Sequence, residues 1–214
     1  MNKNYLFTSE SVSEGHPDKI CDRISDTVVD IMLKKYSEAR VACETMVSTN
    51  RTIIAGEYRL PNEIEISNNE IEKHVRKAVQ DIGYEQENYH WEKMHFECHL
   101  HSQSENIALG VDKSGNKDEG AGDQGLMFGF ACDETKDLMP APIHYSHKIL
   151  QEMSRLRHAD RNSFLLPDSK SQITLQYKNG KPIKASSIVV STQHVKDCSQ
   201  EEIKDLVRTV LKKV

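Results

Sequence analysis

The sequence predicts a mixed α and β fold, organised as two blocks with the same order of elements. Apolar residues recur at helical spacing in four segments. Between these segments lie runs of β-prone residues, which turn signals separate from one another. A polar, glycine-rich stretch at residues 102–125 divides the chain. The first block reads β-α-β-β-α-β, and the second block starts the same order again.

Each element of the first block has its own signal. Pro17 marks the start of a helix, because proline is tolerated in the first helical turn, and Asn68 or Asn69 can cap a second helix that ends at Gly83. The expected elements are a short strand at residues 5–7, a helix with the apolar stripe Ile20, Ile24, Val28 and Ile31, a hairpin of residues 40–48 and 52–59, a helix with the stripe Ile71, Val75, Val79 and Ile82, and a strand at residues 94–100.

The second block lacks the signal for a closing strand. Asn179-Gly180 is a strong hairpin signal, and Ser199 with Glu202 forms a capping box. The expected elements are a strand at residues 126–132, a helix opened by Pro140 and Pro142, a hairpin of residues 171–177 and 182–192, and a helix with the apolar face Ile203, Leu206, Val207, Val210 and Leu211. We therefore expect an amino-terminal domain at residues 1–102, a flexible loop or linker at 103–125, and a truncated domain at 126–214.

Composition excludes several classes of function. The 214 residues carry 28 basic and 33 acidic side chains, and this net charge of −5 argues against nucleic-acid binding through a broad basic face. We expect no membrane segment and no export signal, because no long apolar run occurs and the first residues are polar. The five cysteines are odd in number and widely spaced, which predicts a reducing, cytoplasmic location.

Three short segments place charged residues where phosphate or a cation can bind. Gly15-His16-Pro17-Asp18-Lys19 lies at a helix N-terminus, which favours anions, and magnesium takes one or two carboxylates plus substrate phosphates. Plain helix capping explains the same residues. Pro167-Asp168-Ser169-Lys170 can present a lysine to a phosphate or be a solvated loop. Gly120 to Gly125 matches G-x-G-x-x-G, but a strand follows it instead of the helix that dinucleotide binding requires. Asp123 within that run can hold an amine or a hydrated cation.

Two further groups of polar residues lie in predicted strands. Glu44 and Glu57 interrupt apolar runs, so each is either exposed at an edge or functional, and the hairpin register decides whether they share a face. A row of one cysteine and three histidines permits zinc binding, but a structural zinc site needs four ligands at turn-like spacing, so partly exposed strand histidines are the favoured interpretation. The row consists of His95, Cys98, His99 and His101.

Taken together, these segments resemble the S-adenosylmethionine synthetase (methionine adenosyltransferase) family. The resemblance runs over nearly the whole chain and involves several long motifs in the same order. The matching stretches are Phe7 to Lys19, Arg40 to Thr45, Gly120 to Gly129, Leu138 to Ile143, Pro167 to Gln172 and Ser191 to His194.

The resemblance implies an α+β fold of repeated β-α-β-β-α-β domains, with the second repeat incomplete. It also implies a reaction in which the methionine sulfur attacks the 5′ carbon of ATP and expels the triphosphate, which is cleaved to pyrophosphate and phosphate. Family members assemble as homodimers or dimers of dimers, with active sites between subunits. The resemblance also assigns roles to single residues. The catalytic residues are His16 and Lys170, and ATP is bound by Glu10, His16, Asp168, Ser169 and Lys170. L-Methionine is bound by Glu57, Gln103 and Asp123, magnesium by Asp18, and potassium by Glu44.

The sequence departs from the family pattern in two places. Gln103 is followed by Ser104-Glu105-Asn106, where the family usually has Ser-Pro-Asp. Without the proline, the start of the loop at residues 103–125, which closes over the active site in the family, is less constrained. Family members also continue into a third domain with further phosphate-binding lysines, so we expect a carboxy-terminal segment to be needed for the full site. Two hypotheses follow. The chain is either the amino-terminal portion of the enzyme, inactive alone, or a non-catalytic remnant or regulatory module that pairs with full-length subunits.

Overall fold

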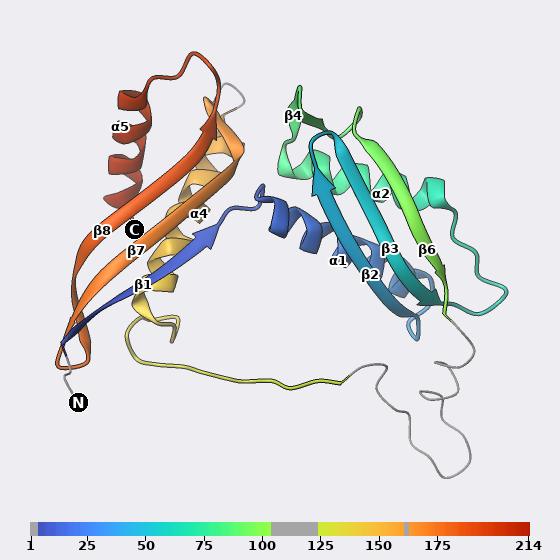
Figure 1. Cartoon of the computed structure of the whole chain (residues 1–214), viewed down its shortest axis with the longest axis horizontal. Coiled ribbons are helices and arrows are strands. Elements are labelled where there is room, and N and C mark those ends of the chain that lie inside the picture. Colours follow the sequence, from blue (N-terminus) through green and yellow to red (C-terminus); the bar gives the residue numbers. More distant parts are fainter. Residues whose placement is uncertain (1–3, 104–123, 161–162) are drawn as a thin grey trace, which may run out of the picture. The chain divides into compact units, whose positions relative to one another are not determined.

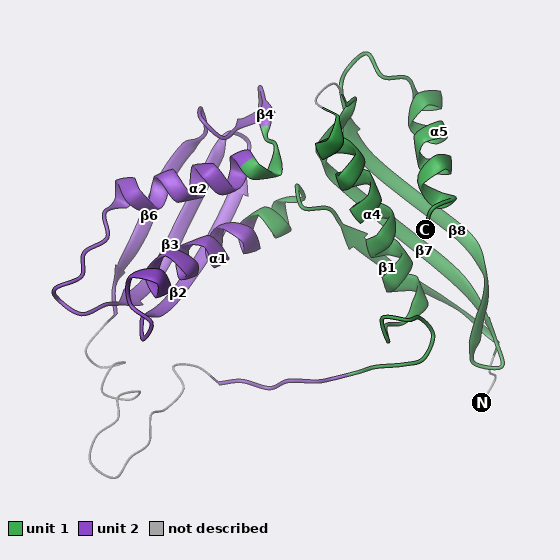
Figure 2. Ribbon diagram, turned by 180° about the vertical axis from the view of Figure 1, so that it is seen from behind, with its two compact units in different colours: residues 1–20, 81–84, 130–214 green, residues 21–80, 85–129 purple. Residues whose placement is uncertain are grey.

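The computed structural model describes residues 4–103, 124–160 and 163–214. The chain forms an α+β structure that divides into two compact units, coloured separately in Figure 2. Unit 1 comprises residues 1–20, 81–84 and 130–214, and unit 2 comprises residues 21–80 and 85–129. Each unit contains a three-stranded sheet with helices on one face (Figure 1). The two units therefore alternate along the chain instead of following one another.

Unit 1 is an antiparallel sheet of strand order β1-β7-β8. Helix α4 packs against β1 and β7, and α5 lies beside it on the same face of the sheet (Figure 2). The core between the helices and the sheet consists of apolar side chains that include Ile149, Ile173, Tyr177 and Val210. The elements are β1 (Tyr5–Val12), α4 (Ala141–Ala159), β7 (Leu165–Lys178), β8 (Lys181–His194) and α5 (Gln200–Leu211).

Unit 2 is a mixed sheet of strand order β2-β3-β6, in which β2 and β3 are antiparallel and β3 and β6 are parallel. Helices α1 and α2 lie on one face of this sheet (Figure 2). Their buried stripes, which include Ile24, Val28, Val75 and Val79, are those predicted from helical spacing. The elements are α1 (Pro17–Lys35), which begins in unit 1, β2 (Arg40–Ser48), β3 (Arg51–Arg59), α2 (Asn68–Ile82), the short pair β4 (Glu85–Gln86) and β5 (Tyr89–His90), and β6 (His95–Ser102).

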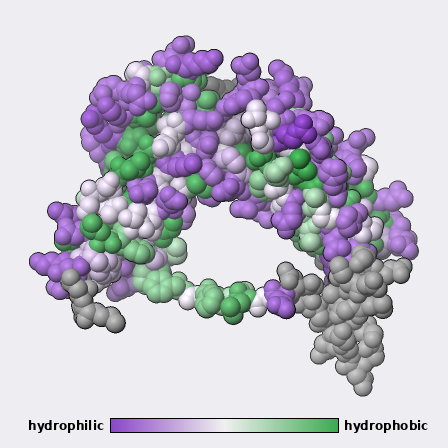
Figure 3. Space-filling view, viewed as in Figure 1, coloured by the Kyte–Doolittle hydropathy of each residue, from purple (hydrophilic) through white to green (hydrophobic). Residues whose placement is uncertain are grey.

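Two strand predictions are corrected by the structure. The first strand runs from Tyr5 to Val12 and not only over residues 5–7, and it pairs along its whole length with β7, from Tyr5 opposite Tyr177 to Val12 opposite Lys170. The expected strand at residues 126–132 is not a strand, and Met127 and Phe128 are 93% and 91% exposed. Figure 3 shows this segment as a hydrophobic stretch of the chain. An apolar run forms a strand only beside a free sheet edge, and this run has no β-partner among the described residues.

The turns and most helix ends follow their sequence signals. Asn50, Asn179 and Gly180 have positive φ angles, as tight hairpin turns require. Ser199 and Glu202 form the predicted capping box. The cap of α2 differs from the prediction, because Ser67 Oγ accepts the Glu70 N–H at 3.1 Å in place of Asn68 or Asn69. Ser67 immediately precedes the helix, where a short hydroxyl side chain reaches the third amide.

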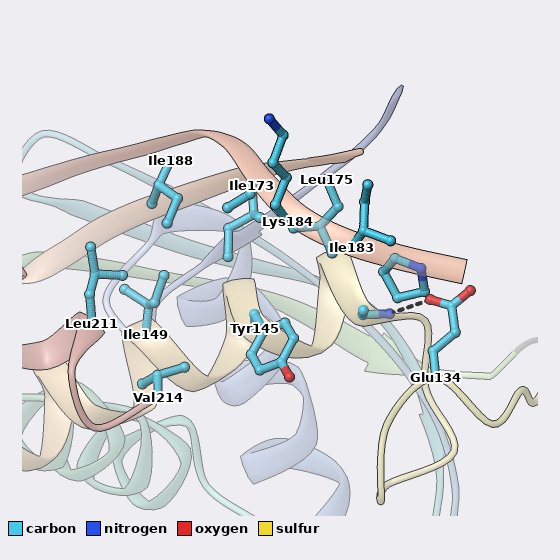
Figure 4. A pocket seen from close by; sticks show the side chains of 13 residues that line it. Glu134, Tyr145, Ile149, Ile173, Leu175, Ile183, Lys184, Ile188, Leu211 and Val214 are labelled. Atoms are coloured by element: carbon cyan, nitrogen blue, oxygen red, sulfur yellow. Dashed lines mark hydrogen bonds between the residues drawn. The ribbon is translucent and has the colours of Figure 1, made fainter. Parts of the chain in front are cut away.

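Glu134 makes two hydrogen bonds at the edge of the unit 1 core. Its Oε2 accepts hydrogen bonds from the Tyr177 hydroxyl at 2.6 Å and from the Ala141 N–H at 2.8 Å. Burial, together with the neighbouring carboxylate, raises the pKa of Tyr177, so the hydroxyl remains a donor. Figure 4 shows the Glu134 contact to Ala141 at the edge of a largely apolar cavity of about 390 Å³. One carboxylate thus accepts hydrogen bonds both from the first amide of α4 and from the hydroxyl of a buried tyrosine.

We predict that Glu134→Ala lowers the free energy of unfolding of unit 1 by about 1–3 kcal/mol, because it leaves the buried Tyr177 hydroxyl without its acceptor. Asp133→Ala is the matched control, since Asp133 is exposed, and it should change stability by no more than about 0.5 kcal/mol. Urea denaturation at pH 7 measures both. Equal losses in the two variants would contradict the role given to Glu134.

Candidate functional site

The turn between β1 and α1, residues 13–16, is hydrogen-bonded to β7. The Ser13 N–H donates to the Ser169 carbonyl at 2.8 Å, and Ser13 Oγ donates to the Pro167 carbonyl at 2.7 Å while accepting the Ser169 N–H at 2.8 Å. Gly15 permits the close approach, because a Cβ there would lie 2.4 Å from the Pro167 carbonyl carbon. The Tyr84 hydroxyl donates to the Gly15 carbonyl. Together these contacts fix the position of the turn relative to β7.

His16 follows this turn at the N-terminus of α1. The Asp18 N–H donates to His16 Nδ1 at 3.2 Å, so in the neutral imidazole the proton lies on Nε2. The His16 side chain is 14% exposed, whereas that of Asp18 is 85% exposed and its Oδ2 lies 3.6 Å from His16 Nδ1. The helix start therefore presents a hydrogen-bond donor and an open carboxylate together. A helix N-terminus also favours an anionic ligand.

Three of the predicted ATP residues share one face of the unit 1 sheet. Antiparallel partners lie on the same face, so Glu10, opposite Gln172, lies on the face that carries Lys170. Asp168 is two residues before Lys170 in β7 and points the same way. Ser11 and Ser171 are buried on the opposite face, toward α4, where the Ser171 hydroxyl donates to the Ser146 carbonyl at 2.7 Å. The face that carries Lys170 thus gathers two carboxylates and one ammonium.

Asp168 is the electrostatically unusual member of this group. Burial raises the pKa of its carboxyl, and the charges of His16 and Lys170 partly oppose that rise. Its Oδ1 is buried and has no hydrogen-bond partner, and among the described side chains only Gln103 Oε1 in unit 2 is in the same state. Buried polar atoms are normally paired, so an unpaired oxygen points to a ligand. Both residues are ones for which the sequence predicts substrate binding.

Ser169 differs from its neighbours in β7. Its side chain is buried, and its Oγ lies 2.8 Å from Thr192 Oγ1. Its backbone N–H and carbonyl are both bonded to Ser13. Ser169 therefore has its polar groups bonded within the protein and supports the turn before His16. Sequence reasoning missed Ser13 and Tyr84, because the partners of both residues are distant in the chain and no local pattern marks them.

In unit 2 the register places Glu44 and Glu57 on one face of the sheet. Glu44 lies opposite Ala55 and Glu57 opposite Ala42, so the two carboxylates are diagonal neighbours. Glu44 is exposed and Glu57 is half-buried, on the face opposite to the one that buries Thr52 and Ile54. Gln103 follows β6, and its N–H donates to the Tyr58 carbonyl at 2.8 Å. The question that the sequence left open is thus answered in favour of a shared face.

His95, His99 and His101 share one face of β6, because side chains alternate along a strand. His95 Nε2 and His99 Nε2 lie 3.3 and 3.5 Å from the oxygens of Glu97, and both side chains are exposed. Cys98 points to the other face, where its Sγ donates to Asn68 Oδ1 at 3.5 Å. No group of three or more His, Cys, Asp or Glu side chains in the described part of the chain is arranged to hold a metal ion. The histidines instead surround a carboxylate that Arg51 also contacts.

The predicted methionine residue Asp123 and most of the predicted loop at 103–125 lie outside the described residues. Within residues 4–103, 124–160 and 163–214, none of the helices combines the length and apolar character needed to cross a membrane.

The chain matches two family models, which together cover most of its length. Residues 4–105 match the S-adenosylmethionine synthetase N-terminal domain, and residues 118–214 match the central domain. The S-adenosylmethionine synthase of Rhodospirillum centenum is 60% identical over 205 residues, which cover 96% of this chain and 52% of that protein. The corresponding protein of Erythrobacter litoralis is 57% identical over 221 residues, covering 100% and 55%. The chain therefore spans about half the length of the curated relatives it matches.

We predict that Asp168→Asn stabilises unit 1 and that the gain is larger at pH 7 than at pH 4. Because burial raises the folded-state pKa of Asp168 above the usual value for an aspartate, the ionised carboxylate costs stability. That cost is absent at low pH, where both states are protonated, and grows as the pH rises through the folded-state pKa. Thermal unfolding at the two pH values checks this, with exposed Asp197→Asn as the control. A stability change independent of pH would contradict the assignment.

Proposed function

The chain belongs to the S-adenosylmethionine synthetase family, and we propose that it supplies part of the active site of a methionine adenosyltransferase. That enzyme forms S-adenosylmethionine from ATP and L-methionine, and water cleaves the expelled triphosphate to phosphate and pyrophosphate. We also propose that the rest of the relatives' length is needed for turnover, since this chain aligns with 52–55% of the two relatives compared above.

The unpaired buried oxygens of Asp168 and Gln103 carry this proposal. Each belongs to a residue that the family resemblance assigns to a substrate, Asp168 to ATP and Gln103 to methionine. A buried oxygen without a donor costs about 1–3 kcal/mol, and a substrate N–H or O–H would remove that cost. We therefore assign Asp168 to a donor group of the nucleotide and the Gln103 amide oxygen to the methionine ammonium, with Glu57 supplying a carboxylate for that ammonium.

In the proposed reaction the methionine sulfur displaces the triphosphate from the 5′ carbon of ATP, and no covalent enzyme intermediate forms. Catalysis then rests on alignment and on stabilising the charge that develops on the leaving group. His16 Nε2–H is the donor that we assign to the oxygen of the breaking bond, because Nδ1 already accepts the Asp18 N–H. The Lys170 ammonium, exposed on the face that carries Asp168, is assigned to the triphosphate. Glu10 lies on that face and faces the nucleotide or its metal.

The residues present fit the two metal ions that the family generally uses. Magnesium takes one or two carboxylates and completes its shell with phosphate oxygens and water, which suits the open Asp18 carboxylate at a helix start that favours anions. When bound, magnesium would neutralise triphosphate charge. Glu44 offers one exposed carboxylate to potassium, and it needs further oxygen ligands from elsewhere. Asp18 and Glu44 are the residues of this chain that we propose as ligands.

We propose a homodimer or a dimer of dimers that uses the open face of the unit 2 sheet. Helices α1 and α2 lie on the other face (Figure 2), while Met46 on the open face is 56% exposed. Glu44 and Glu57 share that face, so a second copy packed there would lie against proposed ligand residues. We place the reaction in the cytoplasm, because the five cysteines show no paired spacing.

We predict that His16→Ala, in an assembly that makes S-adenosylmethionine, lowers kcat by about 100-fold while the Kd for ATP changes little, because the His16 contact strengthens as charge develops. Steady-state kinetics and ATP titration separate the two effects. His74→Ala, an exposed histidine of α2, is the control and should leave both constants unchanged. Unaltered kcat in His16→Ala would remove His16 from the mechanism.

We further predict that the 214-residue chain alone makes no detectable S-adenosylmethionine. Its proposed triphosphate donors are His16 and Lys170 with the metal at Asp18, and each missing donor costs about 3 kcal/mol of transition-state stabilisation. The chain should gain activity when co-expressed with the remaining carboxy-terminal part of a relative, with product measured by mass spectrometry. Product from the lone chain would overturn the prediction. Absence of product from the pair would favour a non-catalytic module that associates with full-length subunits.

A further inference from the structure

Glu14, in the turn that precedes His16, makes a half-buried ion pair that no family assignment uses. Arg157 Nη2 on α4 donates to Glu14 Oε1 at 2.5 Å. His158 Nε2 lies 2.8 Å from the same oxygen, and the Ser154 hydroxyl donates to it as well. The Arg157 side chain is only 10% exposed. One carboxylate oxygen of the turn is thus bound by three side chains of one helix.

Arg157 also connects α4 to the segment that follows α2. At Gly83, with a φ of +98°, a Cβ would lie 2.5 Å from Arg157 Nη1, so only glycine permits the guanidinium its position. The next residue, Tyr84, is 5% exposed, and its hydroxyl donates to the Gly15 carbonyl. The turn that ends at His16 is therefore held from two sides, by α4 through Glu14 and by residues 83–84 through Gly15.

The contacts of Glu14 determine its charge state. Burial alone would raise the pKa of Glu14, but hydrogen bonds from Ser154 and His158 and the charge of Arg157 lower it below 4.5. Glu14 is therefore ionised at neutral pH, and Arg157 is always charged. If Arg157 is removed, the half-buried Glu14 carboxylate loses its charged partner, so the position of the turn depends on both members.

We propose that Arg157 and Glu14 are positioning residues that hold His16 in place for the reaction. They act through the turn, since neither is assigned to a substrate. This inference rests on the proposed function for its catalytic consequence, whereas the positioning itself is a property of the structure. The alternative is that the pair stabilises unit 1 as a whole without any specific effect on the turn.

Amide hydrogen exchange, followed by NMR, separates these two roles without any need for activity. In Arg157→Met the amides of Ser13 and His16, which are bonded to Ser169 and Ser13, should exchange about tenfold faster or more. Amides of β7 and β8 beyond residue 172 should keep their rates. Arg157→Lys, which keeps the charge and one donor, should restore most of the protection. Arg155→Met, on the same helix but at an exposed arginine that pairs with Glu152, is the matched control and should change nothing in the turn.

Kinetics of the co-expressed pair then test the catalytic consequence. Arg157→Met should lower kcat by about tenfold to a hundredfold with little change in KM for ATP, as expected when a reacting group is misplaced. Unchanged exchange at Ser13 and His16, or equal acceleration across all of unit 1, would overturn the proposal. Wild-type protein that makes no product would count against the proposed function instead, and the exchange result would still decide whether Arg157 holds the turn.

Discussion

The candidate site depends on the antiparallel pairing of β1 with β7, two strands that lie more than 150 residues apart in the chain. The pairing continues past the end of β1 into the Ser13 contacts with Pro167 and Ser169, and so places His16 beside Asp168 and Lys170. Without it, the helix start at Pro17 would be an ordinary capped terminus. The plain capping interpretation of His16 and Asp18 is accurate for the local geometry, but it does not include the charged residues that β7 brings to the same end of unit 1.

Local features were predictable from the sequence, and long-range pairing was not. The stripes of α1 and α2, the Asn179-Gly180 turn and the Ser199–Glu202 box each depend on residues a few positions apart, and each was confirmed. The partner of β1 depends on which sheet edge is free, which no local pattern records. The strand expected at residues 126–132 was wrong for the same reason, because an apolar run shows that a segment can pair but not what it pairs with.

The candidate residues were found by resemblance, and the structure adds physical reasons for some of them. Asp168 and Gln103 have unpaired buried oxygens, and Glu44 and Glu57 share an open sheet face. Ser169 is different, because its hydroxyl and backbone are bonded to Thr192 and Ser13. Supporting residues such as Ser13, Glu14 and Tyr84 escaped sequence reasoning, since a serine, a glutamate or a tyrosine gains such a role only through its distant partner. Their contacts keep the turn before His16 in place.

The central claim is that His16 donates from Nε2 to a triphosphate held at the start of α1. It is tested most directly by titrating the chain with Mg²⁺ and tripolyphosphate while recording the imidazole carbon–proton resonances of its 10 histidines. The His16 resonance, identified with a His16→Asn variant, should shift with saturable binding, while those of His95 and His99 on the unit 2 face stay unchanged. A His16 resonance that does not move, or equal shifts at all three histidines, would contradict the claim.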